Sequence, residues 1–186
     1  MKKNAEERIE EAFLELYQER YFDKISVKDI CVKAGLSRAT FYIYYEDTKS
    51  LLKEIETRVM ENHQIIFEAW LYLDLQNYRW DKPIPIFVNL YRYIEEHKQL
   101  FKALFGKYAS NNFIMKWNEK IEKSIYEKIN QDQIFVDNIE FLVSYIAGGV
   151  QRASVAWIHG NIPLESKEMA LLMTKFMLRA MYDRKG

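Results

Sequence analysis

The sequence is poor in residues that interrupt helices, form disulfides or bind metals. Its 186 residues include three prolines, six glycines, three histidines and one cysteine. A lone cysteine excludes an intrachain disulfide, and Cys31 lies on an apolar helical face where a core position is expected. The histidines, His63, His97 and His159, lack metal-ligand spacing, and there is no glycine-rich phosphate loop. We therefore expect no metal, no cofactor and no catalytic residues.

An excess of charge of one sign and long apolar runs are also missing. The chain has 27 basic and 27 acidic residues, so its overall charge does not favour nucleic acid as a partner. The longest uncharged run is far below the roughly eighteen residues that a membrane span needs. A polar, glutamate-rich stretch follows Met1-Lys2-Lys3, which argues against an export signal. We expect a cytoplasmic protein with no membrane partner.

What the sequence does contain is helical periodicity. Apolar residues make up 49% of the chain and aromatic residues 15%, enough for a sizeable core. They recur at three- and four-residue spacing with no convincing alternation, which predicts an all-α fold of about nine helices. Proline in the segment 81–85 should separate the fourth helix from the fifth. The eighth helix, predicted from about Phe135 to Ile158, is apolar almost all round and needs cover on several sides.

Residues 26–45 have the pattern of two short helices joined by a tight turn. Ser26 and Asp29 have the spacing of a capping box at the start of the first helix. Gly35 suits the left-handed position just after that helix, and Ser37 can cap the next one. Such a unit can place its second helix in a DNA major groove.

The second of these helices should have a buried side and an outward side. Phe41 and Tyr45 are four residues apart and should both be buried. The outward side then carries Arg38, Ala39, Thr40, Tyr42, Ile43 and Tyr44. Guanidinium, methyl and hydroxyl groups of this kind contact base edges and phosphates. Seven basic residues against four acidic ones between Arg20 and Lys53 make this region locally positive.

At these residues the chain resembles the N-terminal domain of the TetR family of bacterial transcriptional regulators. The resemblance runs from about Asn4 to Leu52 and includes Ala34-Gly35-Leu36-Ser37, Thr40-Phe41-Tyr42 and Leu51-Leu52. The family usually has lysine where this chain has Thr48, and Lys49 follows. The resemblance implies a helix-turn-helix DNA-binding domain over residues 1–52. It also implies a helical ligand-binding and dimerisation domain over residues 53–186.

The outward residues and the resemblance together give three sets of candidate site residues. The predicted DNA-binding residues are Ser26, Lys28, Ser37, Arg38, Ala39, Thr40, Tyr42, Tyr44, Thr48 and Lys49. Aromatic side chains that could line a pocket for a small hydrophobic or aromatic effector, or belong to the ordinary core, are Trp70, Phe87, Tyr91, Phe105, Trp117 and Tyr145. The predicted dimer interface, on the last two helices, comprises Val150, Ala153, Trp157, Met169, Met173, Phe176 and Met177.

Gly148 and Gly149 lie in the middle of the predicted eighth helix. Each glycine should cost about 1 kcal/mol relative to alanine, so a compensating feature is expected. A bend or room for a ligand would serve, but close packing of another helix is the interpretation we favour.

The sequence thus predicts a homodimeric DNA-binding transcriptional regulator that is not an enzyme. By the resemblance it would be a repressor, released from a palindromic operator by a small-molecule ligand. Its partners would be double-stranded operator DNA, a second copy of the chain and the effector. The main alternative is a helix-turn-helix module that binds another protein instead of DNA, for which the neutral overall charge and Thr48 are the arguments. A helical-bundle enzyme is a more remote alternative.

Overall fold

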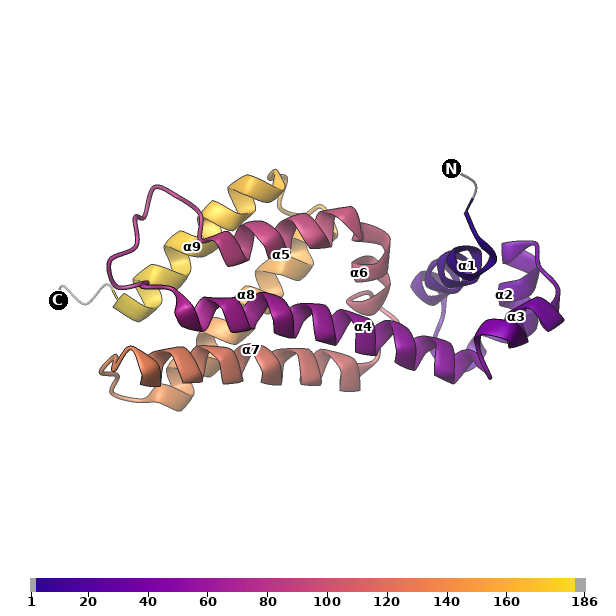
Figure 1. Cartoon of the computed structure of the whole chain (residues 1–186), viewed down its shortest axis with the longest axis horizontal. Helices are drawn as coiled ribbons and strands as arrows, with labels where there is room; N and C mark the ends of the chain where they lie inside the picture. The colour runs from indigo at the N-terminus through magenta and orange to yellow at the C-terminus, as the bar shows by residue number, and fades with distance from the viewer. Residues whose placement is uncertain (1–2, 183–186) are drawn as a thin grey trace. The chain divides into compact units, whose positions relative to one another are not determined.

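The computed structural model describes residues 3–182 and confirms the all-α prediction. Over this range it forms nine α-helices, two short 3-10 helices and no strand (Figure 1). In chain order they are α1 (Ala5–Glu19), η1 (Phe22–Lys24), α2 (Val27–Ala34), α3 (Arg38–Tyr44), α4 (Thr48–Glu68), η2 (Ala69–Tyr72), α5 (Pro85–Glu96), α6 (Lys98–Leu104), α7 (Asn111–Gln131), α8 (Ile139–Ile158) and α9 (Ser166–Tyr182).

The chain divides into two compact units. The first comprises the chain up to Met60 together with Gln99–Ile114, and the second comprises Glu61–Lys98 together with the chain from Met115 onward. The helix α4 continues from the first unit into the second. The sequence did not indicate that residues 99–114, which include α6 from Gln99 onward, group with the N-terminal helices.

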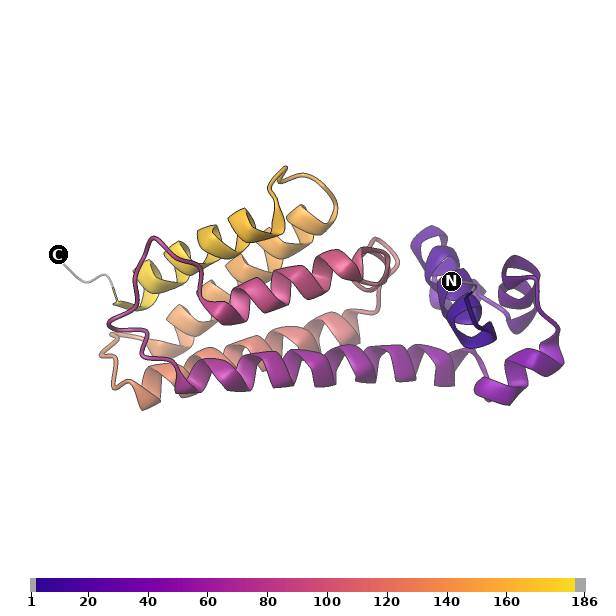
Figure 2. The ribbon, with the colours of Figure 1, turned by 45° about the horizontal axis from the view of Figure 1, so that its top comes forward.

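The core of the first unit is built on α1, whose apolar face is fully buried. Asn4 and Glu7 form a capping box at the start of α1, and Ile9, Phe13 and Tyr17 lie on its buried face. This face packs against α2 and α3, which Figure 2 shows as two short helices joined by a tight turn. The unit therefore presents a short, rigid α2–α3 pair supported from behind by α1.

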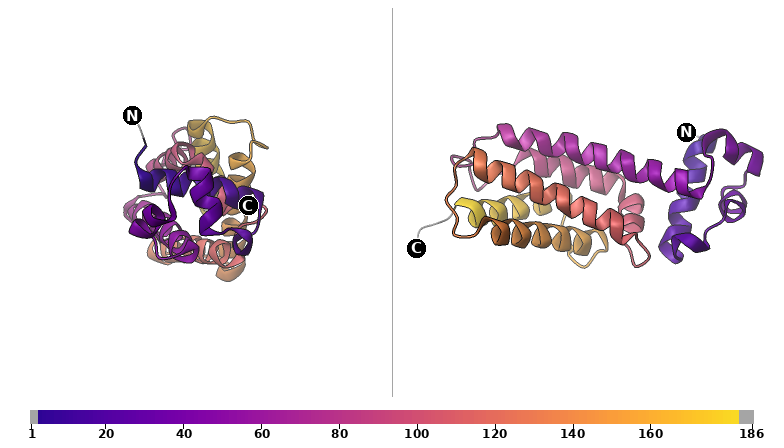
Figure 3. Two further views of the ribbon diagram at one scale, coloured as in Figure 1. Left: turned by 90° about the vertical axis from the view of Figure 1, so that its right-hand side faces the viewer. Right: turned by 90° about the horizontal axis from the view of Figure 1, so that it is seen from below.

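The second unit is a helical bundle in which α5 packs against α9 and α7 runs beside α4 (Figure 3, right). Pro85 occupies the first turn of α5, as the sequence indicates. The backbone N–H of Ile84, just before it, donates 2.8 Å to the Thr174 hydroxyl, which itself donates to the Ala170 carbonyl. Thr174 is fully buried, so a side chain of α9 caps α5 in place of a local capping residue.

A buried lysine fastens the end of the same bundle. Lys128 on α7 is buried, and its ammonium donates 2.6 Å to the Leu73 carbonyl and lies 2.9 Å from the Asp132 carboxylate. The phenol of Tyr182 donates to the other oxygen of Asp132. These contacts join α7, the segment after η2 and the end of α9.

The eighth helix starts later than its apolar pattern predicted. It begins at Ile139 instead of near Phe135, because the Asn138 side chain accepts from the Phe141 N–H and caps it there. Gln133 has a positive φ of 52°, which ends the preceding turn. Across the described part of the chain, no helix has the length and apolar character needed to span a membrane.

Candidate nucleic-acid interface

The turn between α2 and α3 has the conformation that its sequence predicted. The Ser26 side chain accepts from the Asp29 N–H, and the Asp29 carboxylate accepts from the Ser26 N–H and hydroxyl. These hydrogen bonds hold the pKa of Asp29 below its usual value. Gly35 ends α2 with φ 64° and ψ 40°, in the left-handed region where glycine is favoured. Both the capping box and the glycine turn are therefore confirmed.

The two sides of α3 separate as expected. Phe41 and Tyr45 are buried, and their rings lie 5.8 Å apart. Tyr45 donates to the Glu10 carboxylate at 3.1 Å, and burial together with Glu10 raises the pKa of its phenol. On the opposite side, Tyr42 is 57% and Ile43 75% exposed. One side of α3 thus anchors the helix on α1, and the other is free to meet a partner.

The predicted DNA-binding residues lie at the surface of the first unit. Exposed members of the set are Ser26, Lys28, Ser37, Arg38, Ala39, Tyr42, Tyr44 and Lys49, and half-buried members are Thr40 and Thr48. Arg38, Ala39 and Tyr42 belong to α3, whereas Lys28 belongs to α2 and Lys49 to α4. Two exposed apolar residues also lie in the α2–α3 region: Ile43, which was predicted to face outward, and Val32, which was not singled out. Val32 follows the buried Cys31 in an apolar stretch, so the sequence did not indicate its exposure.

Hydroxyl groups at the turn are only partly used by the protein. The Ser37 hydroxyl accepts from the Thr40 N–H at 3.0 Å and lies 2.8 Å from the Thr40 hydroxyl. Only one hydrogen is needed between these two hydroxyls, so the other remains able to donate to an acceptor such as a phosphate. The Ser26 hydroxyl differs, because its hydrogen is already donated to Asp29 at 2.7 Å.

Residues of α1 that the sequence did not single out stabilise this surface from behind. The Arg8 guanidinium donates to the carbonyls of Ala34 and Gly35, at 2.5 and 3.2 Å, and so binds the exposed carbonyl end of α2. Glu10 also accepts two hydrogen bonds from Arg58 of α4, at 2.9 and 2.6 Å. No short motif would identify such contacts, which join residues 26 to 48 positions apart.

The glutamates of α1 also change the local charge that the sequence suggested. Lys33 lies 2.9 Å from Glu15 and 3.8 Å from Glu19, so two carboxylates offset its charge. Lys28, Arg38 and Lys49 form no ion pair with any residue in the range 3–182. The positive charge available to a partner therefore includes the starts of α2, α3 and α4, where Lys28, Arg38 and Lys49 lie.

The start of α4 is capped locally. The Asp47 carboxylate accepts from the Ser50 N–H at 2.7 Å, and the Ser50 hydroxyl accepts from the Asp47 N–H at 3.1 Å. This reciprocal pair fixes the first turn, on which Thr48 and Lys49 lie. Because Thr48 is not the capping residue, its hydroxyl is not needed to hold the turn.

The predicted effector-binding aromatics are distributed over several places. Trp70, Phe87, Tyr91 and Trp117 are buried in the second unit, where the rings of Trp70 and Phe87 lie 6.4 Å apart. Phe105 belongs to the first unit, where it packs on Phe113. Tyr145 is 69% exposed on α8 and stacks on Phe141. Tyr145 therefore lies at the surface, whereas the other aromatic residues of this set are buried, so the six do not line one common pocket.

Of the predicted dimer residues, those on one face of α8 and α9 line an open apolar groove. This groove of about 820 Å³ is bordered by Tyr145, Gly148, Gly149, Val150, Ala153, Met173, Phe176 and Met177, among others. Phe176 is 60% exposed. Trp157 and Met169 are buried within the chain, and the Trp157 indole N–H donates 2.8 Å to the Leu164 carbonyl.

Gly148 and Gly149 lie in this groove with open space in front of them. A Cβ built on either glycine would meet nothing within 4 Å. No helix of the described chain therefore packs closely against these glycines, and the close packing favoured from the sequence, which did not specify which helix supplies it, stays a prediction. Any close packing here has to come from another molecule.

The sequence matches two family models that together cover most of the chain. Residues 9–55 match a model described as bacterial regulatory proteins, tetR family, and residues 81–179 match a transcriptional regulator C-terminal region. Among residues 3–182 no group of histidine, cysteine, aspartate or glutamate side chains could hold a metal ion.

Relatives with assigned names agree with these matches. Over 146 residues the chain is 26% identical to DhaS of Lactococcus lactis, the dhaKLM operon transcriptional activator, covering 76% of this chain and 73% of DhaS. It is also 28% identical over 108 residues to the transcriptional regulator YxbF of Bacillus subtilis. This alignment covers 58% of this chain but only 28% of YxbF.

Solved structures show the same fold. The structure of the dihydroxyacetone kinase operon activator DhaS aligns with a TM-score of 0.58 at 20% identity, covering 95% of this chain and 96% of DhaS. The fatty acid degradation regulator FadR from Bacillus halodurans aligns with a TM-score of 0.66 at 13% identity, covering 96% of each chain.

A capped helix-turn-helix on an all-α scaffold, with exposed basic residues at the turn, defines a DNA-binding transcriptional regulator and not an enzyme. The chain belongs to the TetR family of bacterial regulators.

Proposed function

We propose that the chain works as a homodimer that binds a palindromic operator through two copies of α3. The observation that carries this proposal is the outward side of α3, where Arg38, Ala39 and Tyr42 are exposed while Phe41 and Tyr45 anchor the helix. The two-fold axis of a dimer would place the half-site centres about 34 Å apart, one turn of DNA, or a multiple of that distance. We assign DNA reading to residues 1–52 and the other functions to residues 53–186.

The apolar groove on α8 and α9 supports the homodimer. An exposed apolar patch of this kind is costly unless a partner covers it, and the open space at Gly148 and Gly149 allows a helix to approach closely. A second copy offers the same face, as a two-fold interface requires. The interface that we propose therefore centres on Gly149, Ala153, Met173 and Phe176, with Tyr145 at its border.

Phe176→Asp tests this interface. We expect the dimer dissociation constant to rise at least tenfold, because a charge would replace an apolar side chain at the centre of the contact. Light scattering after size-exclusion chromatography measures the change. Tyr72→Asp is the matched control, since Tyr72 is also an exposed aromatic residue but lies on η2, outside the groove. A dimer unaffected by Phe176→Asp would rule out this face.

DNA binding is tested by footprinting and by its salt dependence. We expect a symmetric protected site near the regulator's own gene, and an affinity that falls steeply with salt because Arg38 and Lys49 would displace counterions from phosphates. Arg38→Ala should weaken binding at least tenfold, whereas Arg92→Ala, an exposed arginine of α5, should not. If folded protein gave no protection at low salt, the protein-interaction alternative would replace this proposal.

Repression is the direction of regulation that we propose. A dimer seated on its operator excludes other proteins from that DNA and needs no further contact surface. The relative DhaS is named as a transcriptional activator, which makes activation the second candidate. A reporter fused to the protected promoter decides between them. Its expression should rise when the regulator gene is deleted, and a fall would show activation instead.

The last part of the proposal is control by a small molecule, acting in the cytoplasm where the operator is. Such a ligand changes operator affinity only if it binds the free and DNA-bound arrangements with different affinities. Ligands can be found by thermal shift, because a molecule that binds the native state raises its apparent stability. A ligand that bound free protein and DNA complex equally tightly would contradict this mechanism.

A further inference from the structure

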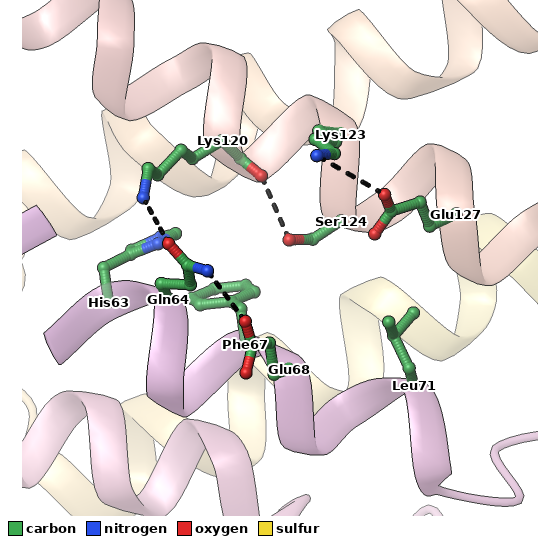
Figure 4. A pocket seen from close by; sticks show the side chains of 9 residues that line it. All are labelled: His63, Gln64, Phe67, Glu68, Leu71, Lys120, Lys123, Ser124 and Glu127. Atoms are coloured by element: carbon green, nitrogen blue, oxygen red, sulfur yellow. Dashed lines mark hydrogen bonds and ion pairs between the residues drawn. The ribbon is translucent and has the colours of Figure 1, made fainter. Parts of the chain in front are cut away.

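The second unit contains a cavity between α4 and α7 with a volume of about 190 Å³ (Figure 4). His63, Phe67 and Leu71 line it from α4 and η2, and Lys120 and Ser124 line it from α7. None of these five residues was among the predicted site residues, although Trp117, which was, packs against His63. The α7 side thus forms a polar wall, and the side from α4 and η2 is mixed, with Phe67 and Leu71 apolar and Gln64 and Glu68 polar.

His63 is the unusual member of this lining. It is only 2% exposed, and neither of its ring nitrogens has a hydrogen-bond partner. Its ring lies between aromatic neighbours, with centroids 4.2 Å from those of both Phe67 and Trp117. Burial, with a smaller contribution from Lys120, lowers the pKa of His63 to about 3. The imidazole is therefore neutral at physiological pH and offers one donor and one acceptor.

Buried polar groups in folded proteins almost always have partners, so an imidazole with two unpaired nitrogens requires an explanation. Ring stacking on Phe67 and Trp117 positions the imidazole but satisfies neither nitrogen. A bound molecule that carries a hydroxyl can pair with one of them, since a hydroxyl can accept from the N–H or donate to the other nitrogen.

The charged groups around the cavity favour a neutral molecule. The Lys120 ammonium donates 3.0 Å to the Gln64 side-chain carbonyl, and the Gln64 amide donates 2.8 Å to Glu68. Lys123 lies 3.8 Å from Glu127. Two lysines and two glutamates therefore balance each other around the lining, and no net charge is left for an ion to neutralise.

The volume of the cavity narrows the class of possible ligands further. An engineered cavity of about 150 Å³ in another protein holds benzene, so about 190 Å³ suits a molecule with a single ring. Figure 4 shows the Gln64 amide beside His63, with Lys120 reaching toward it from α7. Gln64 is exposed and held only by its hydrogen bonds to Lys120 and Glu68, so its side chain can rotate outward to admit a ring that lies against Phe67.

We propose that this cavity binds a neutral, single-ring molecule whose hydroxyl group hydrogen-bonds to one of the two unpaired nitrogens of His63. The ring would lie against Phe67 and Leu71, with Ser124 at the polar wall. Occupancy of the site does not depend on DNA. Its use as the effector site rests on the regulatory function proposed above. The helix α4 carries both His63 and the predicted DNA-binding residues Thr48 and Lys49, so one helix joins the two sites.

Phenol, toluene and benzoate form the test on the full-length protein. The three share a ring and differ in carrying a hydroxyl, a methyl or a carboxylate. Titration is followed by the imidazole nitrogen resonances of His63, which are assigned by their absence in His63→Phe. We expect phenol to shift these resonances and to bind about tenfold more tightly than toluene, the effect of one hydrogen bond.

Other outcomes of the titration would overturn the proposal. Equal binding of phenol and toluene would show that His63 makes no hydrogen bond to the ligand. Tighter binding of benzoate would show a site for anions. No binding of phenol would show that the cavity takes only water.

Two variants distinguish ligand binding at His63 from effects of a histidine substitution elsewhere in the protein. His63→Phe keeps the ring shape without the nitrogens and should reduce the preference for phenol over toluene to less than about twofold. The matched control is His97→Phe, because His97 is an exposed histidine at the end of α5 and should leave the preference at about tenfold. If His63→Phe does not fold, the comparison of phenol with toluene on the unmodified protein still decides.

The same samples distinguish this proposal from the proposed function. Protein that protects its operator but shows no His63 shift with phenol refutes the cavity site and leaves DNA regulation standing. A His63 shift with phenol in protein that does not protect an operator would support the cavity site and refute the proposed DNA regulation.

Discussion

Replacing His63 by phenylalanine should make the second unit more stable and less sensitive to acid. His63 is buried between Phe67 and Trp117 with both nitrogens unpaired. Phenylalanine keeps the ring and removes the unpaired groups. Leaving a buried polar group unsatisfied costs about 1–3 kcal/mol, so the variant should gain about that much free energy of unfolding at pH 7.

The pH dependence of the free energy of unfolding provides a second, independent prediction for His63. Above the usual histidine pKa of 6.5, His63 is neutral in both the folded and unfolded states. Below 6.5 the unfolded chain binds a proton, whereas the folded chain does not until about pH 3. The free energy of unfolding therefore falls as pH falls through this window, by up to about 1.4 kcal/mol per pH unit. Between pH 7 and pH 5 the loss from His63 is about 2 kcal/mol.

Tryptophan fluorescence during urea unfolding is the suitable measurement. The chain has four tryptophans, Trp70, Trp80, Trp117 and Trp157, and all lie in the unit that contains His63. Protein concentration is held constant, because dimerisation would change the apparent stability. The native protein and His63→Phe are each unfolded at pH 7 and pH 5.

The difference between the two proteins isolates His63, since every carboxylate that titrates over this range is common to both. We expect the native protein to lose about 2 kcal/mol more than the variant between pH 7 and pH 5. Parallel losses would mean that His63 takes up its proton normally when folded. A variant less stable at pH 7 would mean that the imidazole has partners after all, and the cavity argument would fail with it.

Three further changes test other contacts. Tyr42→Phe should weaken binding to operators of different sequence by about the same factor if the phenol holds a phosphate, and a loss confined to one base position in a binding assay would contradict that role. Thr174→Val leaves the Ile84 N–H unpaired and should lower the free energy of unfolding by about 1–3 kcal/mol in urea, while Thr174→Ser should restore most of it. Lys128→Met should cost about 3–5 kcal/mol by the same assay because it leaves Asp132 without its buried cation. Its control, Lys123→Met, removes an exposed lysine and should stay within about 0.5 kcal/mol.

Local features of the fold were predictable because they depend on neighbouring residues. The Ser26–Asp29 capping box, the left-handed Gly35 and the buried pair Phe41 and Tyr45 all follow from spacings of three or four positions. The late start of α8 at Ile139 shows the limit of periodicity. The apolar pattern continues through Phe135, and a single cap at Asn138 decides where the helix begins.

Features that depend on distant residues could not be predicted in this way. The hydrogen bonds from Arg8 to Ala34 and Gly35 require knowledge of how α1 crosses α2. For His63 the sequence shows one histidine in a helical stretch, and only three-dimensional packing leaves its nitrogens without partners. Likewise, whether an aromatic ring lines a cavity or fills the core depends on packing density, which has no sequence signature.

The position of Arg8 bears on how operator choice can change during evolution. Arg8 binds the carbonyl end of α2 from behind, on a different helix from Arg38 and Tyr42 on the outward side of α3. Residues that fix the geometry of the turn and residues that face a partner are thus different residues. Under the proposed function, substitutions on the outward side would change operator contacts without removing the hydrogen bonds that hold the turn. A transplanted α2–α3 segment, by contrast, would leave behind the guanidinium that holds its turn.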